Sequence, residues 1–192
     1  MKKLWLVLWM LPVLLGLSTC AVEKIRPDYD ALLLDAAAAA DVEQGRAIAA
    51  ERNAQILRGV LREQRVDFDD LLLLARLLDA EAGDRRYSDD YRLCVGEVAL
   101  NRVASPEFPD SLREVVEQYG QYPSAQEPEF ADLRPKRSCA ALALRLLKGE
   151  RRLSPAVLYR STRKIGTAFV RFYDRQEGYT YFCESVYSDL YK

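Results

Sequence analysis

The clearest pattern of apolar and polar positions lies in residues 67–103, where two apolar stretches flank a polar turn. In the first stretch the leucines fall on one side of a helix at about 100° per residue, and Glu81 falls on that same side. Asp67 is a suitable N-cap, and Gly83 is a suitable C′ residue just past the end of the helix. The pattern therefore predicts a helix that ends just beyond Glu81 and turns this carboxyl group toward the core.

A second helix is predicted over about residues 90–103, with Ser88 or Asp89 as its cap. This stretch is apolar on nearly all sides, so the helix should be central. Glu97 lies inside it and is either a structural partner for an arginine or a second carboxylate of an active site. We favour the structural interpretation, because no partner carboxylate stands at a spacing that indicates a two-carboxylate mechanism.

The rest of the domain is expected to hold shorter elements. Two further helices should begin near Ser111 and extend over about residues 137–148, the latter ending at Gly149. After Pro155 the chain is rich in aromatic and β-branched residues, which predicts a small hairpin or irregular strands around a turn at 176–178. The predicted fold class is mainly α, in the α+β sense of a helical domain with a minor β hairpin.

Residues 28–64 are rich in alanine and charged residues and contain no proline, which predicts one or two helices ahead of the domain. Val42, Ala49 and Ile56 recur at intervals of seven and form a narrow apolar stripe. Such a stripe is typical of a coiled-coil seam or of a strap lying on the next domain. We favour a spacer or strap, because an alanine-rich seam buries little area.

Residues 1–20 carry two lysines, an apolar run and then small residues, a pattern typical of a secretory signal that is too short to favour a spanning helix. The ending Leu17–Cys20 resembles the lipobox of bacterial lipoproteins, which predicts lipidation at Cys20. An ordinary cleaved signal and an uncleaved anchor are the alternatives. Every version places the bulk of the protein outside the cytoplasm, and we expect it at the periplasmic face of the cell envelope. The expected organisation is a signal over residues 1–20, a helical spacer over 21–65 and a domain over 66–192.

Composition narrows the chemistry. The chain has 28 basic and 29 acidic residues, so nothing indicates nucleic acid as a partner. Histidine is absent, which removes Ser/His/Asp and Cys/His nucleophilic sites and the usual zinc ligand sets, and we expect neither a metal nor another cofactor. A carboxyl group remains as the candidate acid. At Glu81, apolar neighbours and the helix C-terminus both favour the protonated form. The competing interpretation is a structural pair with Arg85 or Arg86.

Three cysteines remain when Cys20 is set aside. Disulfides form readily outside the cytoplasm, so one pair and one buried thiol is the simplest expectation. We favour a bridge between Cys139 and Cys183, because Cys94 lies within an apolar helix.

Four short motifs follow one another along the domain. They are an A-E-A at the end of the first helix, an L-N-R-V at the end of the second, an S-x-x-F-P in the next loop and a G-Q-aromatic further on. In this order and spacing they resemble the cell wall hydrolase family typified by the spore cortex-lytic enzymes, a branch of the lysozyme-like fold. The residues concerned are Ala80, Glu81 and Ala82; Leu100, Asn101, Arg102 and Val103; Ser105, Phe108 and Pro109; and Gly120, Gln121 and Tyr122.

The resemblance implies a peptidoglycan glycosidase, either a lytic transglycosylase or a muramidase-like enzyme, that cuts the bond between N-acetylmuramic acid and N-acetylglucosamine. Glu81 matches the catalytic glutamate and Gln121 a glutamine of the substrate groove, with Tyr122 and Ser124 beside it and Tyr159 as a further groove residue. The implied partners are glycan strands and, through the N-terminal anchor, a membrane. The alternative is an inactive envelope lipoprotein that binds peptidoglycan or a partner protein, and an envelope or phage assembly role fits either form.

Overall fold

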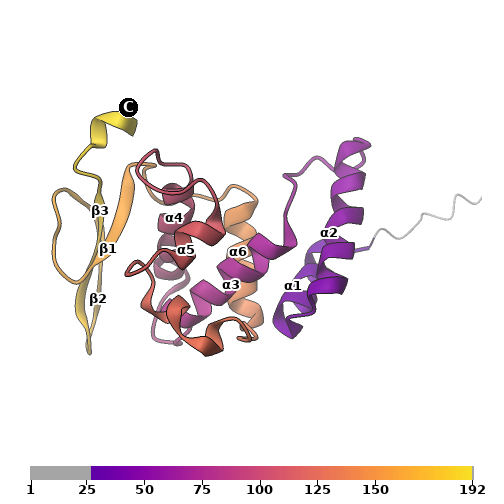
Figure 1. The fold of residues 1–192 in the computed structure, drawn as a ribbon, viewed down its shortest axis with the longest axis horizontal. Helices are drawn as coiled ribbons and strands as arrows, with labels where there is room; N and C mark the ends of the chain where they lie inside the picture. The colour runs from indigo at the N-terminus through magenta and orange to yellow at the C-terminus, as the bar shows by residue number, and fades with distance from the viewer. Residues whose placement is uncertain (1–26, 192) are drawn as a thin grey trace, which may run out of the picture.

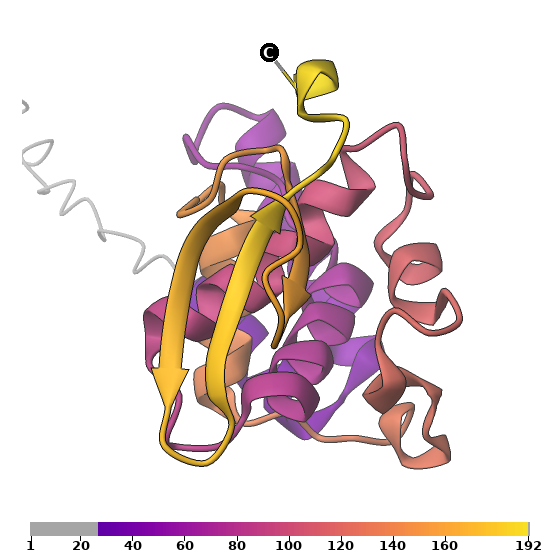
Figure 2. The same cartoon turned by 90° about the vertical axis from the view of Figure 1, so that its left-hand side faces the viewer.

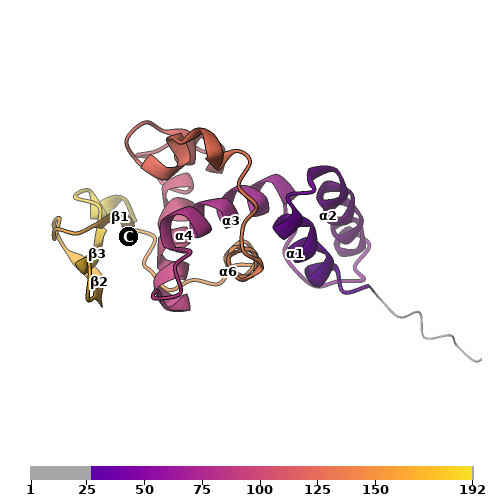
Figure 3. The ribbon, with the colours of Figure 1, turned by 90° about the horizontal axis from the view of Figure 1, so that it is seen from below.

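The protein is described here by a computed structural model of residues 27–191, and Cys20 with the rest of the expected signal lies outside these residues. Figure 1 shows three parts side by side: a helix pair at one end, a helical body in the middle and a small sheet at the other end. Seen from below, the helix pair and the sheet again lie on opposite sides of the body (Figure 3). The described part of the chain is mainly helical with a minor β element, which confirms the predicted fold class.

The elements follow the predicted order. The α-helices are α1 (Tyr29–Ala39), α2 (Val42–Leu57), α3 (Phe68–Ala82), α4 (Asp89–Val103), α5 (Leu112–Glu117) and α6 (Arg137–Leu147). Short 3-10 helices are η1 (Pro123–Gln126), η2 (Pro128–Phe130) and η3 (Ser188–Tyr191), and the strands are β1 (Val157–Ser161), β2 (Ala168–Asp174) and β3 (Gly178–Glu184). Within residues 27–191, no helix has both the length and the apolar character that crossing a bilayer requires.

Side-chain caps start the helices where the sequence predicts them. Asp67 accepts hydrogen bonds from the amides of Asp69 and Asp70 at the start of α3. Ser88 and Ser111 accept from backbone amides in the same way at the starts of α4 and α5. Each such cap stabilises a helix end by about 1 kcal/mol. Local chemistry therefore determines where these helices begin.

Gly83 ends α3 for a different reason from the one that the sequence suggests. A C′ glycine usually adopts a left-handed conformation, whereas Gly83 has φ −70° and ψ −8°. Its amide donates to the carbonyl oxygen of Asp79. A Cβ atom on Gly83 would overlap both that carbonyl and the carboxylate of Asp79. The helix ends at Ala82, just beyond Glu81 as predicted, and the close approach of Asp79 is what requires glycine at residue 83.

The central helix is α4, as its apolar pattern predicts, and eleven of its residues are buried. It packs against α3 and α6 on one side and against β1 on the other. Gly96 permits the close approach of α6, because a Cβ at this position would lie only 2.6 Å from a methyl group of Leu146. Leu74, Leu77 and Leu78 of α3 are fully buried against this core, and each contributes about 2 kcal/mol by leaving water.

The sheet has the strand order β1-β3-β2, with every neighbouring pair antiparallel. The predicted hairpin is β2 with β3, and β1 adds a third strand to it. Exposed and half-buried residues alternate along β2, so the sheet has one face toward the helices and one toward solvent. On the inner face, Phe172 and Phe182 meet Tyr91 of α4 edge-on at 5.3 and 5.8 Å. Figure 2 shows the outer face turned to the viewer.

Three polar residues of α4 hold the segment that leads into β1. Glu97 accepts hydrogen bonds from the amides of residues 152 and 153 at 2.6 and 3.0 Å. Asn101 donates to the carbonyl oxygens of residues 154 and 157, and Arg102 donates to that of residue 158. Buried polar groups of this kind are stable only when they are paired. The row Glu97, Asn101 and Arg102 therefore sets the position of β1.

Helices α1 and α2 pack against α3 and α6. Leu33, Ala36 and Ala49 belong to the same buried cluster as the helical body. Gly45 lets α2 lie directly on Phe68, because a Cβ there would overlap the phenyl ring. The boundary expected at residue 66 therefore does not separate two cores.

A buried ionic network ties this helix pair down. Arg52 of α2 is only 1% exposed. Its guanidinium group donates to Glu63 at 2.5 Å, to the carbonyl oxygen of Gln64 at 2.8 Å and to Asp30 at 3.3 Å. Lys148 of α6 binds the same two carboxylates, Asp30 and Glu63, at 2.6 and 3.0 Å. The network joins α1, α2 and α6 at one point.

Replacing Arg52 by methionine should lower the free energy of unfolding by about 2 to 3 kcal/mol. Methionine keeps the packing of the side-chain stem, but Asp30 and Glu63 lose a charged partner. The loss is smaller than for a fully buried pair, because these two carboxylates are 36% and 38% exposed. Urea denaturation of the full chain followed by circular dichroism measures the change.

Arg58→Met is the matched control, because Arg58 is 63% exposed and lies 3.9 Å from Glu51. This variant should change the free energy of unfolding by less than about 0.5 kcal/mol. Equal effects of the two substitutions would show that the network does not stabilise the fold.

Candidate active site

Glu81 stands in the last turn of α3 and meets side chains from two distant parts of the chain. Its carboxylate is 9% exposed. The hydroxyl of Ser124 in η1 donates to Oε1 at 2.5 Å, and the guanidinium of Arg160 in β1 pairs with Oε2. One carboxylate thus joins α3, η1 and β1.

The fold brings these partners together for separate reasons. The turn η1 packs against α3, and this contact brings Ser124 to the helix end. Arg160 lies opposite Phe182 in the sheet register, and Phe182 is on the inner face. The backbone of Leu158, two residues before Arg160, is held by Arg102 of α4 at 2.9 Å. The position of the arginine is therefore set from the central helix.

The Arg160–Glu81 pair changes the expected electrostatics of the site. Burial opposes the charge on Arg160, but the neighbouring Glu81 carboxylate outweighs it and holds the pKa of the guanidinium above its ordinary value. The prediction of an apolar environment around Glu81 is wrong, because a cation from the sheet faces it. The competing prediction of a pair with Arg85 or Arg86 is wrong as well, since the partner comes from β1.

A cavity of about 400 Å³ opens beside Glu81. Its walls come from the end of α3, the loop that follows it, the end of β1 and the β2–β3 hairpin. Most of the lining side chains are polar or aromatic; they include Glu81, Asp84, Tyr87, Tyr91, Arg160 and Thr180. Such a cavity suits a ligand rich in hydroxyl and amide groups.

The tip of the hairpin closes one end of this cavity. Arg86 binds Gln176 and Glu177, and the hydroxyl of Tyr87 donates to Glu177 at 2.8 Å. The ring of Tyr87 stacks on that of Tyr91 with centroids 4.5 Å apart. The loop after α3 and the hairpin tip are thus connected by charge, hydrogen bond and ring contact.

The predicted groove residues separate into two groups. Ser124 reaches Glu81, and Gln121 lies half-buried in the turn before η1. Tyr122 does not offer a ring to a ligand, because it is 4% exposed and lies under the guanidinium of Arg102 at 5.1 Å. Tyr159 is also away from Glu81, since it adjoins Arg160 in β1 and neighbouring strand residues point to opposite faces. Its ring meets Phe108 instead.

Glu97 is not a second carboxylate of the site. Both of its oxygens accept backbone amides before β1, and it does not line the cavity. Burial raises its pKa, while the two amides act in the opposite direction. Glu97 therefore has a structural role, but its partners are the backbone amides of residues 152 and 153, not the side chain of an arginine as expected.

The expected disulfide between Cys139 and Cys183 is wrong. Both thiols are free and buried, as is that of Cys94. Cys139 opens α6 beside Asp79, with its sulfur 3.8 Å from the carboxylate, whereas Cys183 lies in β3. The helix α4 packs against α6 and against β1, and so stands between the two thiols. Among residues 27–191, no cluster of acidic and cysteine side chains is placed to hold a metal ion.

Two residues of the site were not predicted from the sequence. They are Arg160, and Glu177 as the partner of Arg86 and Tyr87. A signal for Arg160 exists, because it lies two residues after the buried Leu158 and so shares a strand face with it. A charged residue on the inner face of a strand needs a partner. Nothing local identifies that partner as Glu81, which lies 79 residues earlier in the sequence.

Comparison with known proteins identifies the family of the chain. A family model described as cell wall hydrolase matches residues 88–186, from the cap of α4 to just past β3. The match spans more than half of the chain, and the protein therefore belongs to the cell wall hydrolase family. Membership supports an enzyme that hydrolyses the cell wall, with peptidoglycan as its substrate. The matched segment contains Ser124 and Arg160 but begins after Glu81. Neither the curated proteins nor the solved structures contain a significant match to the chain.

Replacing Glu177 by glutamine should lower the pKa of Tyr87. Burial, followed by the hydrogen bond to Glu177, raises the pKa of Tyr87 to about 12, against about 10 for an ordinary tyrosine. The raised value means that this phenol stabilises the fold below about pH 10, and that this contribution is lost as the pH rises through 12. Without the carboxylate, part of the shift should vanish.

The ultraviolet absorbance of the phenolate during an alkaline titration measures the pKa, and Tyr87→Phe identifies which transition belongs to this residue. An unchanged transition in Glu177→Gln would mean that the hairpin tip does not hold Tyr87.

Proposed function

We propose that the protein is a lytic transglycosylase that cleaves the bond between N-acetylmuramic acid and N-acetylglucosamine, with Glu81 as general acid and then general base. The observation that carries the proposal is the placement of Glu81. It is a nearly buried carboxylate at a helix end, it lines a polar cavity, and it is oriented by Ser124. Family membership supplies peptidoglycan as the substrate.

The reaction needs one carboxyl group. Protonated Glu81 donates its proton to the glycosidic oxygen while the bond from that oxygen to C1 of the muramyl residue breaks. The resulting carboxylate then takes the proton of the muramyl 6-hydroxyl, and O6 bonds to C1 to close a 1,6-anhydro ring. The proton returns to Glu81 and no water is consumed. This differs from the paired-carboxylate hydrolysis of most glycosidases.

Arg160 and Ser124 act on the two states of Glu81 in this scheme. Arg160 stabilises the carboxylate that forms after the first proton transfer, when the muramyl C1 carries positive charge. Before that step, Glu81 must hold a proton, so the ion pair with Arg160 has to loosen when substrate enters. Ser124 keeps the carboxyl group oriented throughout.

One observation favours a second candidate function. Both oxygens of Glu81 already have partners, Ser124 and Arg160, so neither oxygen is free to meet a glycosidic oxygen. An inactive relative that binds peptidoglycan or an envelope partner is consistent with this arrangement. Binding of sacculi without release of products would support it.

We place the protein at the periplasmic face of the cell envelope, anchored through a lipid on Cys20. The basis is the signal-like sequence of residues 1–20. The described chain begins at α1, at the opposite end of the molecule from the sheet (Figure 1). An anchor ahead of α1 would leave the cavity and the sheet directed away from the membrane.

Replacing Glu81 by glutamine should reduce the release of 1,6-anhydromuropeptides from purified sacculi by at least about 100-fold, because the amide can neither donate nor accept the transferred proton. Glutamine is isosteric, so the melting temperature should change little. Liquid chromatography with mass spectrometry measures the products of the full chain.

Glu43→Gln is the control, because Glu43 is an exposed residue of α2, and it should behave as the wild type. Equal product release by wild type and Glu81→Gln would remove Glu81 from the mechanism. Products with reducing ends would mean hydrolysis by water in place of ring closure.

Replacing Arg160 by methionine should lower the rate of product release by about 100-fold, because the carboxylate that forms after the first proton transfer loses its cationic partner.

Product release from sacculi measures the rate, with Arg113→Met as a control at an exposed arginine of α5. An unchanged rate in Arg160→Met would mean that Arg160 does not stabilise this carboxylate.

A further inference from the structure

The outer face of the sheet carries a row of aromatic side chains that the proposed catalytic site does not use. Tyr173 of β2 and Tyr179 of β3 are direct cross-strand partners, with ring centroids 5.1 Å apart. Tyr181 continues the row, its ring 6.0 Å from that of Tyr179. Tyr173 and Tyr179 are 65% and 43% exposed. We call Tyr173, Tyr179 and Tyr181 the tyrosine row.

Exposed aromatic rings in contact with one another usually mark a binding surface. A tyrosine ring presents an apolar face and a polar hydroxyl, which suits ligands that have both apolar and hydroxyl-bearing faces. Sugar rings are such ligands, because their axial C–H groups lie on a ring face and their hydroxyls lie around the edge. The tyrosine row is therefore a platform on which successive sugar rings can stack.

The basic residues near the tyrosine row indicate the charge of the ligand. The guanidinium of Arg171 lies over the ring of Tyr179 at 4.8 Å. Arg175 is exposed at the hairpin tip, two residues after Tyr173, and Lys164 is exposed in the loop between β1 and β2. Among the described residues, these three cations have no carboxylate within ion-pair distance, although the chain as a whole carries a formal charge of −1. The face therefore favours an anionic ligand.

The tyrosine row and the cavity beside Glu81 share strand β3, and β1 lies next to both. Thr180 lies between Tyr179 and Tyr181 in β3 and lines the cavity from the inner face. Ser161 of β1 also lines the cavity and is the register partner of Tyr181. The sheet therefore separates the cavity from the tyrosine row. When one glycan strand of a peptidoglycan network occupies the cavity, a neighbouring glycan strand can reach the tyrosine row.

We propose that the outer face of the sheet is a second glycan-binding site, which takes a peptidoglycan strand by stacking sugars on the tyrosine row and pairing stem-peptide carboxylates with Arg171, Lys164 and Arg175. Its ligand class rests on the proposed function. The site holds the enzyme on the sacculus while Glu81 acts on an adjacent strand.

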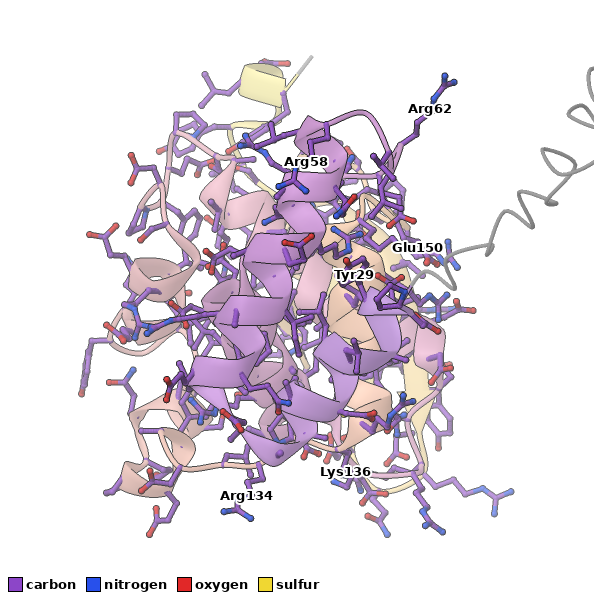
Figure 4. The ribbon with its side chains drawn as sticks, turned by 90° about the vertical axis from the view of Figure 1, so that its right-hand side faces the viewer. Tyr29, Arg58, Arg62, Arg134, Lys136 and Glu150 are labelled. Atoms are coloured by element: carbon purple, nitrogen blue, oxygen red, sulfur yellow. The ribbon has the colours of Figure 1, made fainter. Side chains whose placement is uncertain are left out.

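A membrane surface fits this face less well. The sheet lies at the far end of the molecule from α1, where the described chain begins (Figure 1). Figure 4 views the opposite end, that of α1 and α2, on which Tyr29, Arg58 and Arg62 are labelled. An anchor ahead of α1 would direct the tyrosine row toward the cell wall.

The test measures binding of the full chain to purified sacculi by sedimentation, in a Glu81→Gln background so that binding is separated from turnover. Tyr173→Ala with Tyr179→Ala should weaken binding about tenfold, since each lost ring contact is worth about 0.7 kcal/mol. Tyr173→Phe with Tyr179→Phe keeps the rings and should retain most of the binding. Arg171→Gln with Lys164→Gln should weaken binding and make it less dependent on salt.

Arg58→Gln with Arg62→Gln is the matched charge control, because both arginines are exposed at the opposite end of the molecule (Figure 4). This variant should bind sacculi as the parent does. In an active background, the double alanine variant should cleave a short soluble glycan at the wild-type rate and cleave sacculi more slowly.

Two results would overturn the proposal: sacculus binding that is unchanged in the double alanine variant, or binding that the control variant loses to the same extent. If the first result is accompanied by loss of binding to anionic phospholipid vesicles in the double alanine variant, the face is a membrane surface instead. Tyrosine-dependent sacculus binding without any cleavage by the wild type would refute the proposed catalysis and leave this second site standing.

Discussion

The attachment of β1 to the central helix is the constraint on which the site depends. Glu97, Asn101 and Arg102 are buried polar side chains in an otherwise apolar helix, and each is stable there because it binds backbone groups of the segment entering the sheet. An apolar residue at any of the three positions would leave backbone amides or carbonyls of that segment unpaired in the core. The same bonds place Arg160 opposite the end of α3. The polar groups inside α4 thus determine which cation faces the Glu81 carboxylate, the proposed catalytic group.

The electrostatic state of Glu81 follows from two opposing influences. Its position near the C-terminal end of α3 and its small exposure both disfavour a negative charge, whereas Arg160 and the Ser124 hydroxyl favour it. A general acid that later acts as a base needs both influences, because it must hold a proton before bond cleavage and a stabilised charge after it. In the proposed mechanism, the ion pair between Arg160 and Glu81 opens when substrate binds and forms again after the first proton transfer. The same pair explains why an inactive glycan-binding relative remains the competing interpretation.

The helices and their ends could be predicted from the sequence because their determinants are local. Caps such as Ser88 act within three residues, and the leucine pattern alone turns Glu81 toward the core. The sheet was predicted only as a hairpin, since strand pairing depends on distant partners. Arg160 was missed for the same reason, as its partner is set by tertiary packing. The pairing of Cys139 with Cys183 failed because composition and compartment say which cysteines are able to pair, not which lie within bonding distance.

The ionic network around Arg52 also has a mechanical consequence. Asp30 lies in the first turn of α1, close to where the described chain begins, and it is held by Arg52 of α2 and Lys148 of α6. A force pulling on the chain ahead of α1 meets these bonds before it reaches α3, and α6 shares the strain across its length. The proposed membrane anchor and the proposed second glycan-binding site would put the molecule under such tension. The network would then resist the pull at the N-terminal end of the described chain, far from the cavity beside Glu81.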